Sequence, residues 1–135
     1  MELDATIAAS ASGLRAQALR MRVIAGNLAN ADSVSPTAGG DPYRRRLVTF
    51  APSTDLASGA TGVTVKTITG DRSDFQRIYQ PGSPAADAGG YVKTSNVNSL
   101  IELADMRSAQ RAYEANLTMI EASKSLTMRT IDLIR

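Results

Sequence analysis

Apolar residues recur at steps of three and four near the start of the chain. Residues 4–30 contain no proline, and their apolar positions follow the heptad spacing of a coiled-coil seam. This pattern predicts an amphipathic helix from Asp4 to Asn30, in which alanine alternates with larger side chains so that a partner helix approaches closely. The seam consists of Ile7, Ala11, Leu14, Ala18, Met21, Ala25 and Leu28.

A second helical pattern begins at Ser99 and continues to the last residue. Ser99 followed by Glu102 fits a capping box, in which two side chains satisfy backbone amides at the helix start. Two offset apolar stripes follow, so the apolar arc is too wide for one partner helix to cover. The first stripe is Ala112, Ala115, Met119, Ala122, Leu126 and Leu133, and the second is Met106, Tyr113, Leu117, Ile120 and Ile131.

The segment between these helices, residues 33–97, is rich in Gly, Ser, Thr, Asp and Pro. Tyr43–Phe50 and Gly62–Thr69 have the composition of short strands. Phe75–Tyr79 and Tyr91–Lys93 are expected to pair across a loop that contains Pro81, Gly82, Gly89 and Gly90. This middle segment is therefore predicted to be β-rich, loop-rich and too short for a large core.

These elements predict an α+β fold, with two long terminal helices packed as a coiled coil around a small β-rich insertion. We expect residues 1–32 and 98–135 to form an inner coiled-coil domain and residues 33–97 to form the insertion. Helices of roughly 27 and 36 residues would be about 40 and 54 Å long. Such helices leave part of the wide C-terminal arc exposed, which is typical of an interaction surface that neighbouring copies bury.

The composition excludes several classes of function. The chain of 135 residues has no histidine, which removes the usual general base near neutral pH and the commonest metal ligand. It has no cysteine, and a net charge of only +2 gives no reason to expect a nucleic-acid partner. Arginines interrupt the N-terminal segment before an apolar signal core forms, and no stretch approaches the roughly 20 apolar residues of a membrane span. We expect no catalytic residue, cofactor or metal.

The charged clusters of the middle segment have simple structural interpretations. Arg44–Arg46 is the densest basic run, and is interpreted first as a solvated strand edge, then as a contact to an acidic neighbouring subunit, and last as a nucleic-acid contact. Asp71, Asp74 and Asp87 lie in turn-rich sequence without a metal-loop pattern, where aspartate usually makes local hydrogen bonds. Asn27 and Asn30 by themselves indicate only the end of a helix.

Four segments resemble the flagellar rod and hook proteins. Residues 25–33 (AGNLANADS) resemble the N-terminal signature of that family, and residues 79–93, 96–98 and 108–116 resemble its proximal-rod members. Together these similarities extend over nearly the whole chain. The residues that carry the family motif are Asn27, Leu28, Ala29, Asn30, Ala31, Asp32, Tyr91, Asn96, Val97, Asn98, Tyr113 and Asn116.

The resemblance implies a structural subunit that is exported by the flagellar type III apparatus without signal cleavage. It implies polymerisation in the periplasm, with the terminal helices in the inner layer of a tube that transmits torque from the membrane-ring motor to the hook. The implied partners are copies of the same chain, other rod subunits, the rod-to-ring adaptor and the membrane-ring base. An alternative is another flagellar axial subunit or a type III secreted helical binding protein, and an enzyme is a remote third interpretation.

From the apolar pattern we expect the contacts between subunits to be made by large side chains of both helices. These are Ile7, Leu14, Met21, Leu28, Tyr113, Leu117, Met119, Ile120, Leu126, Ile131 and Leu133.

Overall fold

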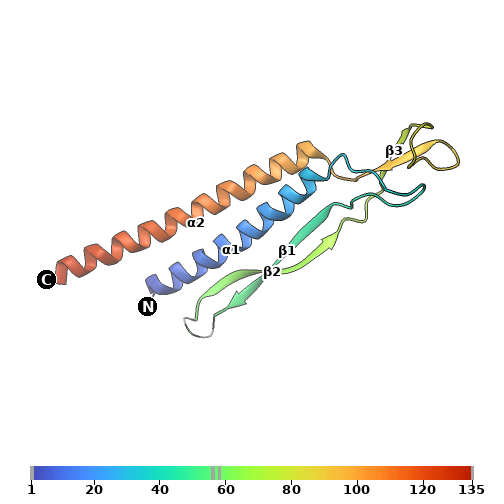
Figure 1. Cartoon of the computed structure of the whole chain (residues 1–135). Coiled ribbons are helices and arrows are strands. Elements are labelled where there is room, and N and C mark those ends of the chain that lie inside the picture. The colour runs from blue at the N-terminus through green and yellow to red at the C-terminus, as the bar shows by residue number, and fades with distance from the viewer. Residues whose placement is uncertain (1, 56, 58, 135) are drawn as a thin grey trace. The chain divides into compact units, whose positions relative to one another are not determined.

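The computed structural model describes residues 2–55, 57 and 59–134. One long helix lies at each end of the chain, and two pairs of antiparallel strands lie between them in the sequence (Figure 1). This confirms the predicted α+β class. The elements in chain order are α1 (Glu2–Ala29), β1 (Arg46–Thr54), β2 (Thr61–Gly70), β3 (Gln76–Tyr79), β4 (Tyr91–Thr94) and α2 (Ser99–Ile134). Strand β1 pairs with β2, and β3 pairs with β4.

The chain forms two compact units, and both helices contribute to each of them. We call the first the terminal unit; it comprises Met1–Met21, Val48–Thr67 and Arg107–Arg135. We call the second the junction unit; it comprises Arg22–Leu47 and Ile68–Met106. The junction unit therefore contains the end of α1, the start of α2 and the β3–β4 pair.

In the terminal unit, small residues at two adjacent positions of α1 allow close approach of other elements. Strand β2 approaches at Ser12, and helix α2 approaches at Gly13. The Ser12 hydroxyl accepts a hydrogen bond from the Val63 backbone N–H at 2.9 Å and donates one to the Ala9 carbonyl. A Cβ atom at Gly62 would lie 3.0 Å from the Ser12 Cβ and collide with its hydroxyl. A Cβ atom at Gly13 would lie 2.8 Å from the Asn116 amide. Glycine at these positions is what permits the contacts.

In the junction unit, β3 and β4 are antiparallel, with Gln76 opposite Thr94 and Tyr79 opposite Tyr91. This confirms the strand pair expected from the sequence. Val92 of β4 is almost completely buried. An isolated bridge joins Val34 to Thr94 on the other side of β4.

The start of α2 differs from the predicted capping box. The side-chain oxygen of Asn98 accepts hydrogen bonds from the N–H groups of Leu100 and Ile101, at 3.0 and 3.3 Å, so Asn98 caps the helix. The prediction that Ser99 and Glu102 form the cap is wrong. Glu102 lies one position further into the helix than a capping box requires, and its carboxylate is buried in a polar network.

The close contact between Ser12 and Gly62 gives a test of the terminal unit. We expect Gly62→Ala to lower the free energy of unfolding by about 1–3 kcal/mol, because the added methyl group overpacks the contact and displaces the Ser12–Val63 hydrogen bond. Chemical denaturation measures the change. Gly82→Ala is the matched control, since a Cβ there meets nothing within 4 Å. Ser12→Gly in the Gly62→Ala background should recover part of the loss, and failure of that rescue would contradict the packing argument.

Candidate functional site

Helix α2 exposes an unusual number of large apolar side chains. No helix in the described part of the chain is long and apolar enough to cross a membrane. Even so, Leu126 is 53% exposed and Leu133 is 87% exposed. The exposed apolar residues of α2 are Leu100, Ile101, Leu103, Leu117, Met119, Leu126, Met128, Ile131, Leu133 and Ile134. This exposed surface of α2 is the candidate functional site.

The apolar residues in the second half of α2 form two separate flanks. Met119, Leu126 and Leu133 are seven residues apart, and seven residues fall within about 20° of two full turns, so they share one side of the helix. We call this the first flank. The second flank consists of Leu117, Met128 and Ile131, which lie on the other side of the helix at the period of 3.6 residues per turn.

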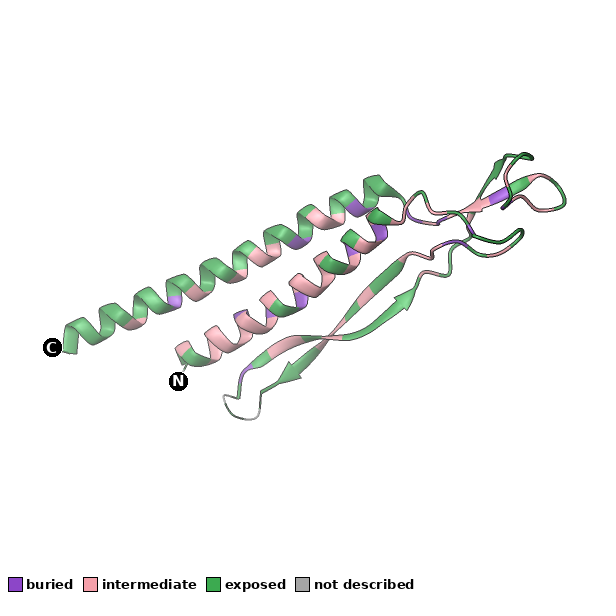
Figure 2. Ribbon diagram, in the orientation of Figure 1, coloured by how far each residue is buried: buried purple, intermediate pink, exposed green. Residues whose placement is uncertain are grey.

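The face between the two flanks is the one that packs against the rest of the chain. It is lined by small and polar residues rather than by large apolar ones. Ala109 and Ser123 are buried on it, and Asn116 and Ile120 are half-buried. Small side chains let backbones approach closely, and the larger apolar residues lie on either side of this face. Figure 2 shows most of α2 as exposed, with a few buried positions along it.

The predicted seam of α1 is not the most buried face of that helix. Ile7, Leu14, Met21 and Leu28 are all half-buried. The buried positions of α1 are instead Ser10, Gly13, Ala16, Ile24 and Asn27, which lie on a neighbouring face of the helix. The period of the helix was predicted correctly, but the side that contacts the chain is set by its small residues.

Asn27, near the end of α1, is the most completely bonded side chain of the junction unit. It is only 1% exposed. Its amide nitrogen donates to the Arg46 carbonyl and to the Glu102 carboxylate, each at 2.9 Å. Its amide oxygen accepts from the Arg46 N–H and the Tyr43 hydroxyl, each at 2.9 Å. These four bonds use the whole hydrogen-bonding capacity of an asparagine amide.

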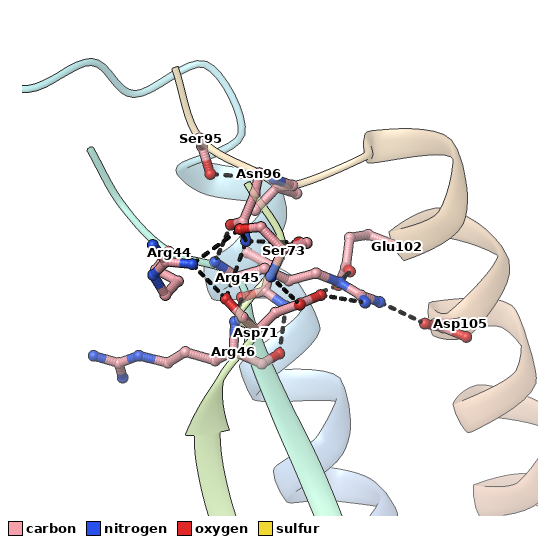
Figure 3. A network of polar contacts seen from close by, with 11 residues as sticks. Arg44, Arg45, Arg46, Asp71, Ser73, Ser95, Asn96, Glu102 and Asp105 are labelled. Carbon is pink, nitrogen blue, oxygen red and sulfur yellow. Dashed lines mark hydrogen bonds and ion pairs between the residues drawn. The ribbon is translucent and has the colours of Figure 1, made fainter. Parts of the chain in front are cut away.

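Arg45, which directly precedes β1, forms ion pairs with three carboxylates, two of them on α2 and the third, Asp71, just after β2 (Figure 3). Its Nε donates to Glu102, which is 1% exposed, and its two terminal nitrogens lie 3.4 Å from Asp71 and 3.3 Å from Asp105. Burial acts to lower the pKa of Arg45, but the bonds and charges of Glu102 and Asp71 outweigh it and raise that pKa. The buried carboxylate of Glu102 is thus held by one amide and one guanidinium.

Asn96 joins the same network from the segment before α2 (Figure 3). Its side-chain oxygen accepts from the Arg45 backbone N–H at 2.7 Å, and its nitrogen donates to the carbonyls of Asp71 and Ser73. Arg44 donates to the same two carbonyls and stacks over the Phe75 ring, 4.2 Å from its centre. The Asn27 and Asn96 side chains therefore form hydrogen bonds with backbone N–H and C=O groups, which is what a neighbouring strand does in a sheet.

The first interpretation of the arginine run, a solvated strand edge, is wrong for Arg44 and Arg45. Their guanidinium groups form hydrogen bonds and ion pairs within the junction unit. Only Arg46 is exposed. The spacing of charged residues in the sequence does not indicate these bonds, because the partners of Arg45 lie 26 to 60 residues away along the chain.

Two of the three turn aspartates, Asp71 and Asp87, make the predicted local hydrogen bonds. The Asp71 carboxylate accepts from the Ser73 N–H, and Asp87 accepts from the N–H groups of Gly89 and Tyr91. These backbone bonds, helped by Arg45 and Arg77 respectively, lower the pKa of both aspartates. In the described residues there is no group of three or more side chains suited to hold a metal ion.

The remaining motif residues have local roles. The Asn30 side chain donates to the Gly26 carbonyl at 2.8 Å and so satisfies the end of α1, as the sequence indicated. Val97 is buried, and Tyr113 is half-buried. The sequence did not indicate the roles of Tyr43, Arg45 and Glu102 in the polar network.

Asn27 provides a test of the polar network. We expect Asn27→Asp to lower the free energy of unfolding by about 3 kcal/mol or more, because a carboxylate cannot donate to the Arg46 carbonyl or to Glu102 and each buried unpaired group costs about 1–3 kcal/mol. Denaturant unfolding measures the loss. Glu102→Gln in the same chain restores one donor and should recover part of it. Asn30→Asp is the control at a less buried motif position, and an equal loss there would argue against the network.

The lowered pKa of Asp71 predicts a pH dependence of stability. Its folded-state pKa lies below the ordinary value of 3.8, so its contribution is complete at neutral pH and is lost as the pH falls through the folded-state pKa. We expect Asp71→Asn to flatten the dependence of unfolding free energy on pH in the acid range. Urea titrations at a series of pH values test this. Asp74→Asn, which removes the same charge from the same loop, is the matched comparison, and an equal effect of both variants would contradict the assignment to Asp71.

Comparison with known proteins identifies the family. Residues 88–133 match the family model described as flagellar basal body rod FlgEFG protein C-terminal. The chain is 49% identical to the flagellar basal-body rod protein FlgC of Agrobacterium fabrum, over 98% of this chain and 96% of that protein. It is 39% identical to FlgC of Salmonella typhimurium, over 90% of each chain, and 38% identical to FlgC of Bacillus subtilis, over 92% of this chain and 93% of that protein. The chain belongs to the FlgC family of flagellar basal-body rod proteins.

Proposed function

We propose that the chain is a subunit of the proximal rod of the flagellum and polymerises through its terminal helices. Family membership makes it a structural protein of the flagellar basal body that assembles with other rod components, and it confirms that the chain is not an enzyme. The observation that carries the proposal is the pair of apolar flanks on α2, which the chain itself leaves uncovered.

The energetics favour covering both flanks with protein. Full burial of a Leu, Ile or Met side chain is worth about 1.5–3 kcal/mol relative to exposure. Burial of the six side chains of the two flanks would therefore contribute several kcal/mol of favourable free energy per subunit. The entropy cost of ordering these side chains is subtracted from that amount. Because the two flanks differ in sequence and lie on different sides of α2, we expect them to contact different surfaces of two neighbours. Contacts of that kind form either closed rings or open helical polymers, and membership of a rod family favours the polymer.

The half-buried residues of both helices complete the proposed interface. Ile7, Leu14, Met21 and Leu28 of α1 retain partly accessible apolar surface. Tyr113 and Ile120 of α2 lie at the edge of its buried face and are half-buried. We assign these residues to the margins of the contacts and the two flanks to their centres, because the flanks have the most apolar surface left to bury.

Location and further partners follow from the family resemblance. Residues 1–32 and 98–135 form the inner coiled-coil layer of the tube in this proposal, and residues 33–97 form its outer part. The subunit is exported by the type III apparatus without signal cleavage and assembles in the periplasm. Its neighbours are copies of itself, other rod subunits, the rod-to-ring adaptor and the membrane-ring base. The assembled tube transmits torque to the hook.

Leu126 tests the role of the first flank. We expect Leu126→Asp to abolish rod assembly and swimming, because a buried unpaired carboxylate opposes the contact, while the monomer stays soluble and folded since Leu126 is 53% exposed. Swimming in soft agar and recovery of the variant in isolated basal bodies are the measurements, in a strain that lacks the native chain.

Ser125→Asp is the matched control. It adds the same charge at the residue directly before Leu126, which is exposed and belongs to neither flank. We expect this variant to swim. Normal swimming of Leu126→Asp, or equal failure of both variants, would contradict the assignment of the first flank to a subunit contact.

A further inference from the structure

Charged side chains border the two apolar flanks of α2. On a helix, residues three and four positions apart are neighbours on the surface. Arg129 is three positions after Leu126 and four before Leu133, so it lies beside the first flank. Three acids are each three or four positions from Leu117 or Met128, so they lie beside the second flank. We call these two lines of charge the basic border, Arg111 and Arg129, and the acidic border, Glu114, Glu121 and Asp132.

The charges of both borders are exposed and are not used by the chain itself. Arg111 is three positions before Glu114, and Arg129 is three positions before Asp132, a spacing at which opposite charges can pair on one helix. Neither pair forms, and no border residue has an ion pair within the part of the chain that the structure describes. These charges are therefore available to a neighbouring molecule.

The two borders carry their charges at the same spacing. Arg111 and Arg129 are 18 residues apart, and so are Glu114 and Asp132. Eighteen residues make about five full turns and rise about 27 Å, so each pair lies on one line along the helix. A shift of three residues, about 4.5 Å, brings both arginines level with these two acids. No other shift brings both arginines level with acids, because Glu121 is not 18 residues from either of the other two.

The two flanks point in opposite directions across α2. Leu117 of the second flank and Leu126 of the first are nine residues apart, which is about two and a half turns. Two copies of α2 placed side by side in the same direction therefore bring the first flank of one against the second flank of the other. In that arrangement the basic border of one helix and the acidic border of the other lie on the same side of the contact. Charges in this position, the e and g positions of a coiled coil, set the choice of partner and its orientation.

We propose that α2 packs side by side against α2 of a second copy of this chain, parallel to it and shifted by three residues. The first flank of one copy lies on the second flank of the other. Arg111 and Arg129 of one copy then face Glu114 and Asp132 of its neighbour. With the same shift, Leu126 is level with the gap between Met128 and Ile131 of the neighbouring copy, which is where a side chain packs in a parallel pair.

Lys124 is the one cation that lies on the second flank, between Leu117 and Ile131. Its aliphatic stem covers apolar surface while its ammonium group stays in water, so it does not prevent the contact.

The occupant is a second copy because one helix carries both complementary borders at one spacing. A contact between two different patches of the same chain repeats from copy to copy, as a ring or a helical polymer requires. The parallel direction rests on the proposed function. A rod that joins a motor ring to a hook has two different ends, and copies related by rotation and rise along its axis all keep the same direction.

Reversal of each border tests the contact between copies. One variant is Arg111→Glu/Arg129→Glu, and the other is Glu114→Arg/Asp132→Arg. In a strain that lacks the native chain, either variant alone places like charges across every contact. We therefore expect each to stop swimming and its recovery in isolated basal bodies to fall about tenfold, because two exposed ion pairs become two repulsive pairs.

Co-expression of the two variants separates contacts between copies from contacts within one helix. Copies that alternate along the row again place arginine against an acid at every contact, so we expect the mixed cells to swim and both chains to be present in basal bodies. Ion pairs within one helix would instead be restored only when all four changes are in one chain. A contact with a different subunit would not be restored by mixing. Mixed cells that do not swim would overturn the proposal in either case.

A chain with all four changes and a matched control complete the test. The chain with four changes restores every contact between copies, so we expect it to swim, and its failure would also overturn the proposal. Arg107→Glu/Glu121→Arg is the control, since it reverses two exposed charges that have no counterpart at the three-residue shift. We expect this control to swim, and a loss equal to that of either border reversal would overturn the shift.

The outcome is distinguishable from failure of the proposed function. Leu126→Asp tests burial of the first flank by any neighbour, whereas the border reversals test a second copy in one register. Loss of assembly in Leu126→Asp, together with normal swimming of both border reversals, would leave the rod function in place and overturn the pairing of copies.

Discussion

The buried amide of Asn27 is the interaction on which the junction unit depends. A side-chain amide that is 1% exposed is stable only when its donors and acceptors are all paired, and Asn27 pairs with both backbone groups of Arg46 as well as with Tyr43 and Glu102. The end of α1, the start of β1 and the first turns of α2 therefore meet at one side chain. Any residue other than asparagine leaves at least one of these groups unpaired.

The polar network and the apolar flanks of α2 are consequences of the same distribution of residues. The face of α2 that the chain buries carries Glu102, Ala109, Asn116 and Ser123, which are small or polar. Polar groups give this contact a defined register, because each requires its own partner. The large apolar residues are left exposed on the two flanks, and in the proposed function their burial by other subunits contributes free energy to assembly.

The strand pair β3–β4 is held to the rest of the junction unit along one edge. The backbone of β4 is covered by Ser33, Val34 and Asp87. The other edge belongs to β3, which has no further backbone partner among the residues described and is only four residues long, and very short edge strands are one way in which proteins limit unwanted strand pairing.

The sequence by itself determined the two helices, the paired strands around Tyr79 and Tyr91 and the local bonds of the turn aspartates, because these depend on periodicity and turn chemistry over short distances. Family membership was also evident from its motifs. Only the tertiary structure decided which face of each helix is buried, that Asn98 rather than Ser99 caps α2, and that Arg45 binds Glu102. The Asn98 cap is a local contact that depends on the residue at which α2 begins. The buried helix faces and the bond between Arg45 and Glu102 depend on partners far apart in the chain, and neither the spacing nor the type of a residue shows which distant group will satisfy it.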